Sequence, residues 1–193
     1  AIGDVVGAER VLVGMTYHGA SLDAPGRVRH TAVGQTFIGE PSHTISSRVQ
    51  VLAETLTQAG VVTEVTDRVW SLAWGKLIVN LNNALNALAD LPLRRQLALR
   101  PWRCLFADQM AEGLAAIRAE GIRPVSPTPI PVGLMPPLLR VPNVVFEALL
   151  GRTMKIDPEA RSSMWEDLQR RRHTEIDYLQ GVITEIAERR GLD

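Results

Sequence analysis

A single lysine within a long apolar helical stretch limits what this chain can fold into. Residues 66–89 carry apolar side chains at helical spacing, and Lys76 lies among them. At about 100° per residue, Asn80 and Asn83 fall on the same stripe as Lys76. A cation and two amides on one face of a mostly buried helix must be paired, neutralised or exposed to a ligand. We therefore predict a helix whose polar stripe lines a cleft for a polar, anionic small molecule.

A structural alternative for Lys76 is that its stem packs along the helix while its ammonium group reaches water. From the spacing alone this alternative is favoured, because lysines usually behave in this way. The asparagine content counts against it. Asparagine is a poor helix former, and Asn80, Asn82, Asn83 and Asn86 lower the helix propensity without capping an end. Both interpretations remain open at this point.

Charge, cysteine and histidine content exclude several classes of function. Lys and Arg number 21, as do Asp and Glu, so no basic field for nucleic acid is expected. The apolar runs are shorter than the ~18 residues that span a bilayer, so no membrane segment is predicted. The single cysteine, Cys104, is predicted to pack in the core, which favours a reducing, cytoplasmic location. The four histidines lack metal-site spacing, so no metal is expected.

The chain divides into a short region of strand character and a longer helical region. Residues 1–41 are β-rich, with strands predicted at 11–16, 27–31 and 35–39, a turn at 24–26 and a hairpin turn at 32–34. From residue 42 onward we predict helices at residues 46–59, 66–89, 102–119, 144–150, 157–171 and 174–190. The predicted caps are Ser46, Thr66 or Asp67, Asp157 and Thr174. Residues 123–142 contain seven prolines and are predicted to form a long, stiff connection. The expected fold class is mainly α, with an all-helical domain over 42–193 after a few strands.

A second group of polar residues lies near the end of the chain. Ser163 falls within one predicted helix, and Glu175 lies in the first turn of the next, where the helix dipole favours a carboxylate. A hydroxyl and a carboxylate from these two helices could converge on a ligand. Local structure offers a simpler account, in which Ser163 is solvated and Glu175 is an ordinary first-turn acid. No glycine-rich phosphate loop or dinucleotide fingerprint accompanies them.

Five stretches of this chain resemble the second half of ketopantoate reductase. In order, these are VGMTYHGA (13–20), WGKLIVN (74–80), AEGI (119–122), SSMWED (162–167) and HTEIDYLQG (173–181). The resemblance implies a helical domain of the 6-phosphogluconate dehydrogenase C-terminal-like type over residues 42–193. It also implies that residues 1–41 are the last strands of a Rossmann domain that binds NADPH.

The family reduces the ketone of 2-dehydropantoate to D-pantoate, on the route to pantothenate and coenzyme A. The resemblance implies that Lys76 is the general acid, that Asn80 and Ser163 bind the 2-oxo acid, and that Glu175 helps to hold substrate or cofactor. The family has an asparagine eight positions after the lysine, where this chain has Ala84, and Asn83 is expected to take that role.

Because most of the cofactor half is absent from residues 1–193, we expect these residues to bind NADPH weakly or not at all and to be inactive alone. Two alternatives to ketopantoate reduction remain. One is a paralogous reductase of another branched or aromatic 2-oxo acid. The other is a non-catalytic helical module that forms a homodimer through the helical domain.

Overall fold

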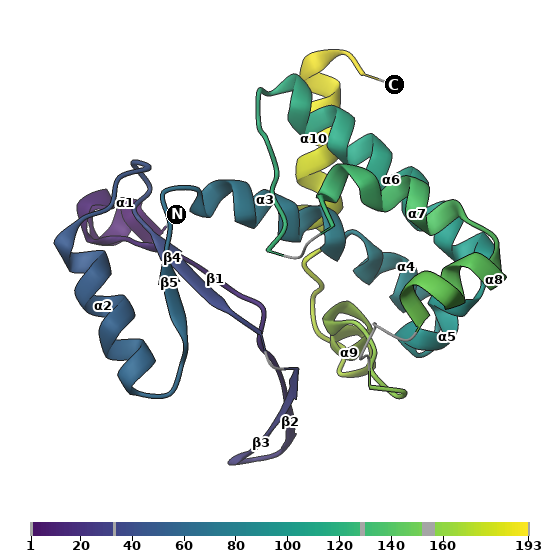
Figure 1. Cartoon of the computed structure of the whole chain (residues 1–193), viewed down its shortest axis with the longest axis horizontal. Coiled ribbons are helices and arrows are strands. Elements are labelled where there is room, and N and C mark those ends of the chain that lie inside the picture. Colours follow the sequence, from purple (N-terminus) through teal and green to yellow (C-terminus); the bar gives the residue numbers. More distant parts are fainter. Residues whose placement is uncertain (1, 33, 128–129, 152–156, 193) are drawn as a thin grey trace. The chain divides into compact units, whose positions relative to one another are not determined.

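A computed structural model describes residues 2–32, 34–127, 130–151 and 157–192, which divide into two compact units (Figure 1). The first unit is Ala1–Ala73 and the second is Trp74–Asp193. The division falls within α3 (Val69–Asn80), the helix that carries Lys76. The prediction of a mainly α chain with a few preceding strands is confirmed.

The first unit is built around a three-stranded sheet in the order β1 (Val13–Thr16), β4 (Thr36–Gly39) and β5 (Thr63–Val65). β1 pairs antiparallel with β4, and β4 pairs parallel with β5. The helix α2 (Ser47–Gln58) connects the parallel pair, and the predicted cap Ser46 accepts a hydrogen bond from the Val49 amide. The short α1 (Ile2–Val6) and η1 (Ala8–Arg10) precede the sheet. The buried core of this unit comprises Ile38, Val49 and Ala53, with Leu12 and Val65 packed against it.

The strands predicted at 11–16, 27–31 and 35–39 are all present, but the predicted hairpin between the last two is wrong. The strand β3 (Arg27–Ala32) pairs with the unpredicted β2 (Gly19–Ala24), whereas β4 pairs with β1 and β5, so no hairpin joins residues 27–31 to 35–39. The turn predicted at residues 24–26 is confirmed. It closes the β2–β3 hairpin, with Gly26 at φ +76°. Val33, in the predicted hairpin turn, lies outside the described residues. β5 also interrupts the region predicted to be all-helical, because three residues are too few to give a strand period.

The carboxylate of Glu40 joins the end of β4 to the start of α2. Arg48 holds it in a two-point contact, with Nε 2.7 Å from Oε1 and Nη2 2.5 Å from Oε2. The Ser46 hydroxyl donates to the same carboxylate at 2.5 Å. These hydrogen bonds lower the pKa of Glu40 to about 2, because both stabilise the ionised form.

Glu40→Gln is expected to lower the stability of the first unit near neutral pH, but not in strong acid. A carboxyl with a lowered pKa contributes stability above its ordinary value of 4.5 and loses it as the pH falls toward 2. Urea midpoints of parent and variant should therefore differ at neutral pH and converge between about 4.5 and 2. A difference that persists unchanged at the acid end would contradict this origin.

The second unit packs helices around α6 (Arg100–Ala119). α7 (Met135–Arg140) and α10 (Val182–Arg190) lie against α6 (Figure 1). The remaining elements of this unit are α4 (Asn82–Ala89), α5 (Leu93–Ala98), η2 (Val132–Leu134), α8 (Asn143–Phe146), the π-helix η3 (Glu147–Gly151), α9 (Ser163–Gln169) and the π-helix η4 (Asp177–Gly181). No helix in the described ranges is long and apolar enough to cross a bilayer.

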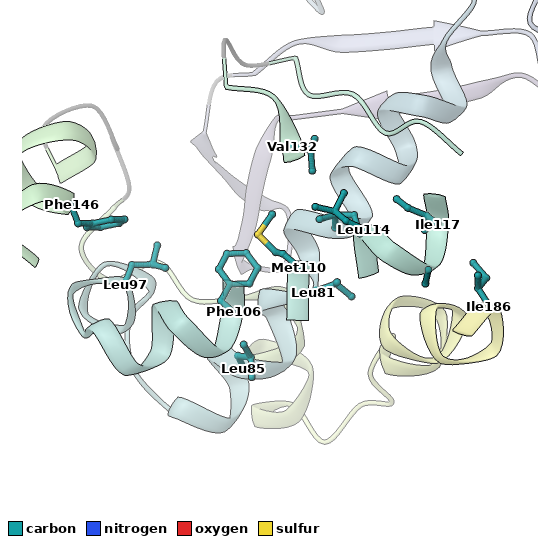
Figure 2. Close-up of a cluster of buried hydrophobic side chains, with 12 residues drawn as sticks. Leu81, Leu85, Leu97, Phe106, Met110, Leu114, Ile117, Val132, Phe146 and Ile186 are labelled. Atoms are coloured by element: carbon teal, nitrogen blue, oxygen red, sulfur yellow. The ribbon is translucent and has the colours of Figure 1, made fainter. Parts of the chain in front are cut away.

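The core of the second unit follows the predicted helical periodicity. Met110, Leu114 and Ile117 are buried along α6, and Leu81 meets them from the start of α4 (Figure 2). Leu85, Leu97, Phe106, Phe146 and Ile186 extend the same cluster. Burial of large aliphatic and aromatic side chains of this kind stabilises by roughly 1.5–3 kcal/mol each. Ile78 on α3 belongs to the same buried cluster, which therefore joins the Lys76 helix to α6.

Besides the unpredicted α5, the structure differs from two predictions in the second unit. The proline-rich connection contains α7, because Pro136 and Pro137 occupy its first turn, where the missing amide hydrogens are not needed. Residues 157–159 form a turn, in which the Asp157 carboxylate accepts from the Glu159 amide. The helix predicted to begin there starts at Ser163 instead, with Ser162 as its cap.

Candidate functional site

Within the second unit, the fold brings Lys76 and Glu175 close enough for their charges to interact. Lys76 lies on α3 and is partly buried, and Glu175 is exposed just before η4. Burial lowers the pKa of Lys76, because desolvation disfavours the ammonium form, and the Glu175 carboxylate opposes that effect by raising the pKa. The net effect is a lowered pKa, so the Lys76 proton is easier to release than that of a solvated lysine.

The helix predicted over residues 66–89 is interrupted at Leu81. α3 ends at Asn80 and α4 begins at Asn82, with Leu81 at φ −55° and ψ −27°. The Leu81 carbonyl accepts a hydrogen bond from Gln180 Nε2 at 2.9 Å, so η4 is tied to the interruption. Asn80 therefore precedes the interruption and Asn83 follows it. Leu81 itself keeps helical dihedrals, and its amide donates to the Leu77 carbonyl at 3.0 Å, so the role expected of Asn83 stays a prediction.

Ser163 is the exposed first residue of α9, and its neighbour Ser162 attaches that helix to α4. The Ser162 hydroxyl donates to the Asn83 carbonyl at 3.0 Å and accepts from the Trp165 amide at 3.1 Å. The Ser162 amide donates to Asn86 Oδ1 at 2.8 Å. Two of the predicted substrate residues, Asn83 and Ser163, are thus linked through Ser162.

Glu175 occupies a different helical position from the one predicted. Its carbonyl is the acceptor for the Tyr178 and Leu179 amides, at 3.0 and 3.1 Å, so Glu175 is the residue at which helical hydrogen bonding begins. The predicted cap, Thr174, precedes it by one residue. The shift leaves the carboxylate at the positive end of the helix, where an ionised acid is stabilised.

A buried group of amides was not identified from the sequence as part of the site. Asn82, Asn86 and Gln96 are buried and hydrogen-bonded to one another through their side chains. The available signal was the number of asparagines in a helix, of which Asn82 and Asn86 belong to this group. Gln96 gave no signal, since a glutamine on a short helix is ordinary. Their cost to helix propensity is offset by tertiary hydrogen bonds.

Models of one protein family match most of this chain. The model described as "Ketopantoate reductase PanE/ApbA C terminal" matches residues 68–193, and that described as "Ketopantoate reductase PanE/ApbA" matches residues 1–43. The chain belongs to the ketopantoate reductase family. The family and the helical architecture inferred from the five sequence stretches are therefore confirmed.

Curated members of the family align with nearly the whole chain. The 2-dehydropantoate 2-reductase of Mesorhizobium japonicum is 32% identical over 187 residues, which cover 96% of this chain and 52% of that protein. The enzyme of the same name from Halobacterium salinarum is 30% identical over 186 residues, covering 94% of this chain and 54% of that protein. The chain thus spans about half the length of the curated relatives it matches.

Solved structures show the same fold. The 2-dehydropantoate 2-reductase from Geobacter metallireducens superposes with a TM-score of 0.75 at 27% identity, covering 100% of this chain and 59% of that one. D-mandelate dehydrogenase, solved with NADH and anilino(oxo)acetate, gives a TM-score of 0.80 at 21% identity, covering 100% and 58%. A ketopantoate reductase from Staphylococcus aureus, described as dimeric, gives 0.67 at 17% identity, covering 95% and 56%. The last two show the fold alone.

Proposed function

We propose that this chain provides the substrate-binding and proton-donating half of an NADPH-dependent 2-dehydropantoate 2-reductase, which reduces ketopantoate to D-pantoate. The observation that carries the proposal is that Lys76 is partly buried, which lowers its pKa, while the charge of Glu175 acts to raise that pKa. Lys76 and Asn80 are one helical turn apart on α3, so their side chains share a face. The Ser162 hydroxyl donates to the Asn83 carbonyl, which brings Asn83 near Ser163.

These residues suit the reduction of a 2-oxo acid. Hydride addition to the ketone builds negative charge on its oxygen, and an ammonium group beside that oxygen stabilises the charge and supplies the proton. Neutral donors such as Asn80, Asn83 and Ser163 can bind the substrate carboxylate and hydroxyl without holding a competing charge. The lowered pKa of Lys76 brings the proton donor closer to the pH at which it must act.

The cofactor half of the proposed reaction falls mainly outside these residues. NADPH supplies the hydride when bound. Glu175 suits a supporting role, because its exposed carboxylate can accept hydrogen bonds from a cofactor hydroxyl or amide while its charge acts on Lys76. We propose that the nucleotide itself is held by a domain joined to this chain in the full-length reductase.

The rate of ketopantoate reduction by the full-length enzyme is expected to fall at alkaline pH. Lys76 must be protonated to act as an acid, so turnover is lost as the pH rises through its pKa, which burial places below the ordinary value for lysine. Glu175→Gln should move this basic limb to still lower pH, because the carboxylate raises the pKa of Lys76.

The matched control for this pH profile is Asp177→Asn. Asp177 is an exposed acid two residues after Glu175, at the start of η4. Its neutralisation is expected to leave the basic limb in place. A limb that moves equally in both variants, or that moves upward in Glu175→Gln, would show that Lys76 is not the group that titrates.

A second candidate is the reduction of a different 2-oxo acid. Ala84 stands where the family pattern has an asparagine, and its side chain is buried, so position 84 offers no amide to a substrate. NADPH oxidation by the full-length enzyme, measured with ketopantoate and with other branched and aromatic 2-oxo acids, separates the two candidates. The highest kcat/KM identifies the substrate, and we expect ketopantoate to give it.

We also propose that the helical domain forms a homodimer, as its dimeric relative from Staphylococcus aureus supports. Light scattering after size exclusion should give twice the mass of one chain. The non-catalytic alternative requires the dimer to persist in a full-length protein that shows no reductase activity.

A further inference from the structure

Four buried polar residues form one connected hydrogen-bond network, which Ser162 joins through its backbone amide. They are Asn82, Asn86, Gln96 and Ser162, with exposed fractions of 7%, 0%, 0% and 4%. Buried polar groups of this kind are costly unless they are paired, so a complete network specifies one arrangement of the elements that carry it. Here those elements are α4, α5 and the start of α9.

Asn86 is the central member, because it contacts three separate parts of the chain. Its Nδ2 donates to Gln96 Oε1 at 2.9 Å and to the Leu91 carbonyl at 2.9 Å, and its Oδ1 accepts from the Ser162 amide at 2.8 Å. Asn82 contacts only Gln96 in this network, with one hydrogen bond in each direction at 3.3 and 3.1 Å. Asn86 therefore connects α5 to the first turn of α9, whereas Asn82 does not reach α9.

The residue fixed by Asn86 immediately precedes Ser163. The Ser162 amide is held by the Asn86 side chain, and the Ser162 hydroxyl is held by the Asn83 carbonyl. Loss of the Asn86 acceptor would leave a buried amide hydrogen unpaired, which the start of α9 can relieve only by moving toward water. Such a movement would displace Ser163 relative to Asn83.

We propose that Asn86 is a positioning residue for substrate binding, which sets the distance between Ser163 and Asn83 through Ser162. This inference rests on the proposed function of those two residues. Ser163 and Asn83 bind groups that are present in both the ground state and the transition state. Their displacement should therefore raise KM much more than it lowers kcat, whereas a change at Lys76 acts on kcat.

The fold is expected to survive the loss of Asn86, because α9 has a second attachment to α4. Asp90 Oδ1 accepts from Trp165 Nε1 at 2.7 Å and from Arg161 Nη1 at 3.0 Å. Asn86→Leu keeps a similar volume and removes all three hydrogen bonds. Asn86→Asp keeps an acceptor for the Ser162 amide and removes the donors to Gln96 and Leu91, so it separates positioning from stability.

The test compares steady-state kinetics and amide hydrogen exchange in variants of the full-length reductase. In Asn86→Leu we expect the KM for the 2-oxo acid to rise about tenfold or more, the effect of losing one to two hydrogen bonds, with kcat changed by less than about threefold. Exchange at residues 162–165 should accelerate, while exchange in the buried turns of α6 stays slow. Asn86→Asp should lower the melting temperature but keep KM close to the parental value.

Asn82→Ala is the matched control, because it breaks the same buried network without touching Ser162. It should lower the melting temperature and leave KM and exchange at residues 162–165 unchanged. Unchanged exchange at these residues in Asn86→Leu overturns the proposal, whatever the activity of the enzyme. So does an unchanged KM in Asn86→Leu when Ser163→Ala raises KM. A parent enzyme that reduces no 2-oxo acid refutes the proposed function instead, and the exchange result then decides the structural role of Asn86 by itself.

Discussion

Replacing Lys76 with methionine in the full-length reductase is expected to lower kcat for ketopantoate by about 10²–10⁴-fold, the usual contribution of a positioned general acid. Methionine keeps most of the apolar stem that packs along α3, so the fold should persist. The variant loses the ammonium group. Burial lowers the pKa of this group, and the charge of Glu175 partly offsets that effect. Because this group acts on charge that develops in the transition state, kcat should fall more than KM rises.

Two further variants sharpen the result for Lys76. Lys76→Arg keeps the positive charge but holds its proton too tightly to donate it, so its kcat should remain far below that of the parent. Arg68→Met removes an exposed cation ahead of α3 and should leave kcat unchanged. Stopped-flow or steady-state measurement of NADPH oxidation gives these rates. Parental turnover in Lys76→Met, with an intact circular dichroism spectrum, would remove Lys76 from the proposed role.

The second large effect is expected at Arg103, a fully buried cation on α6. Its guanidinium donates to backbone carbonyls at the ends of α5 and α7 and to one side-chain amide, at 2.8–3.2 Å; these acceptors are Leu97, Ala98, Leu139, Val141 and Asn143 Oδ1. The same group lies 4.1 Å from the centre of the Phe146 ring. The last carbonyls of a helix have no partner within the helix, so Arg103 satisfies groups that α5 and α7 cannot satisfy themselves.

Arg103→Met is expected to lower the free energy of unfolding of the second unit by about 3–5 kcal/mol. Five oxygens in buried or partly buried hydrogen bonds lose a donor, at roughly 1–3 kcal/mol for each that water cannot reach, and the removal of a desolvated cation offsets part of this cost. Urea unfolding followed by far-ultraviolet circular dichroism reports mainly on this helical unit. Lysine at position 103 should rescue little, because one ammonium group cannot match a planar fork of donors.

Arg100→Met provides the control for the change at Arg103. Arg100 lies one turn earlier on α6, is exposed, and donates to a single carbonyl, that of Arg140, at 3.1 Å. Its replacement should change the free energy of unfolding by no more than about 0.5 kcal/mol, as for most surface positions. Equal losses in the two variants would mean that the charge of α6, and not the buried hydrogen bonds, accounts for the effect.

Features that depend on neighbouring residues were predictable from the sequence. Ser46 caps α2 as expected, and Gly121 and Gly191 have positive φ just beyond the ends of α6 and α10. The apolar faces of α3 and α6 are buried as their spacing indicates. These features follow from helical periodicity and from the few residue types that suit each helix end.

Strand partners and short elements were not predictable in the same way. Alternation indicates that residues 27–31 form a strand, but pairing with β2 instead of β4 depends on which strands the rest of the chain leaves available. Residues 157–159 carry the residue types of a helix start, yet they form a turn because the Ser162 side chain caps the helix later. In both cases the local sequence allowed two structures, and tertiary contacts selected one of them.

The features of the candidate site also separate into those that depend on neighbouring residues and those that depend on tertiary contacts. By itself the sequence determined that a lysine and asparagines share a face of an apolar helix, and that Ser163 and Glu175 lie at later helix starts, because periodicity and capping act over a few residues. Only the tertiary structure decided that the charge of Glu175 acts on Lys76, that Gln180 binds the Leu81 carbonyl between α3 and α4, and that Asn86 holds the residue before Ser163. Each of these depends on groups that are distant in the chain, and on burial that makes an unpaired polar atom costly.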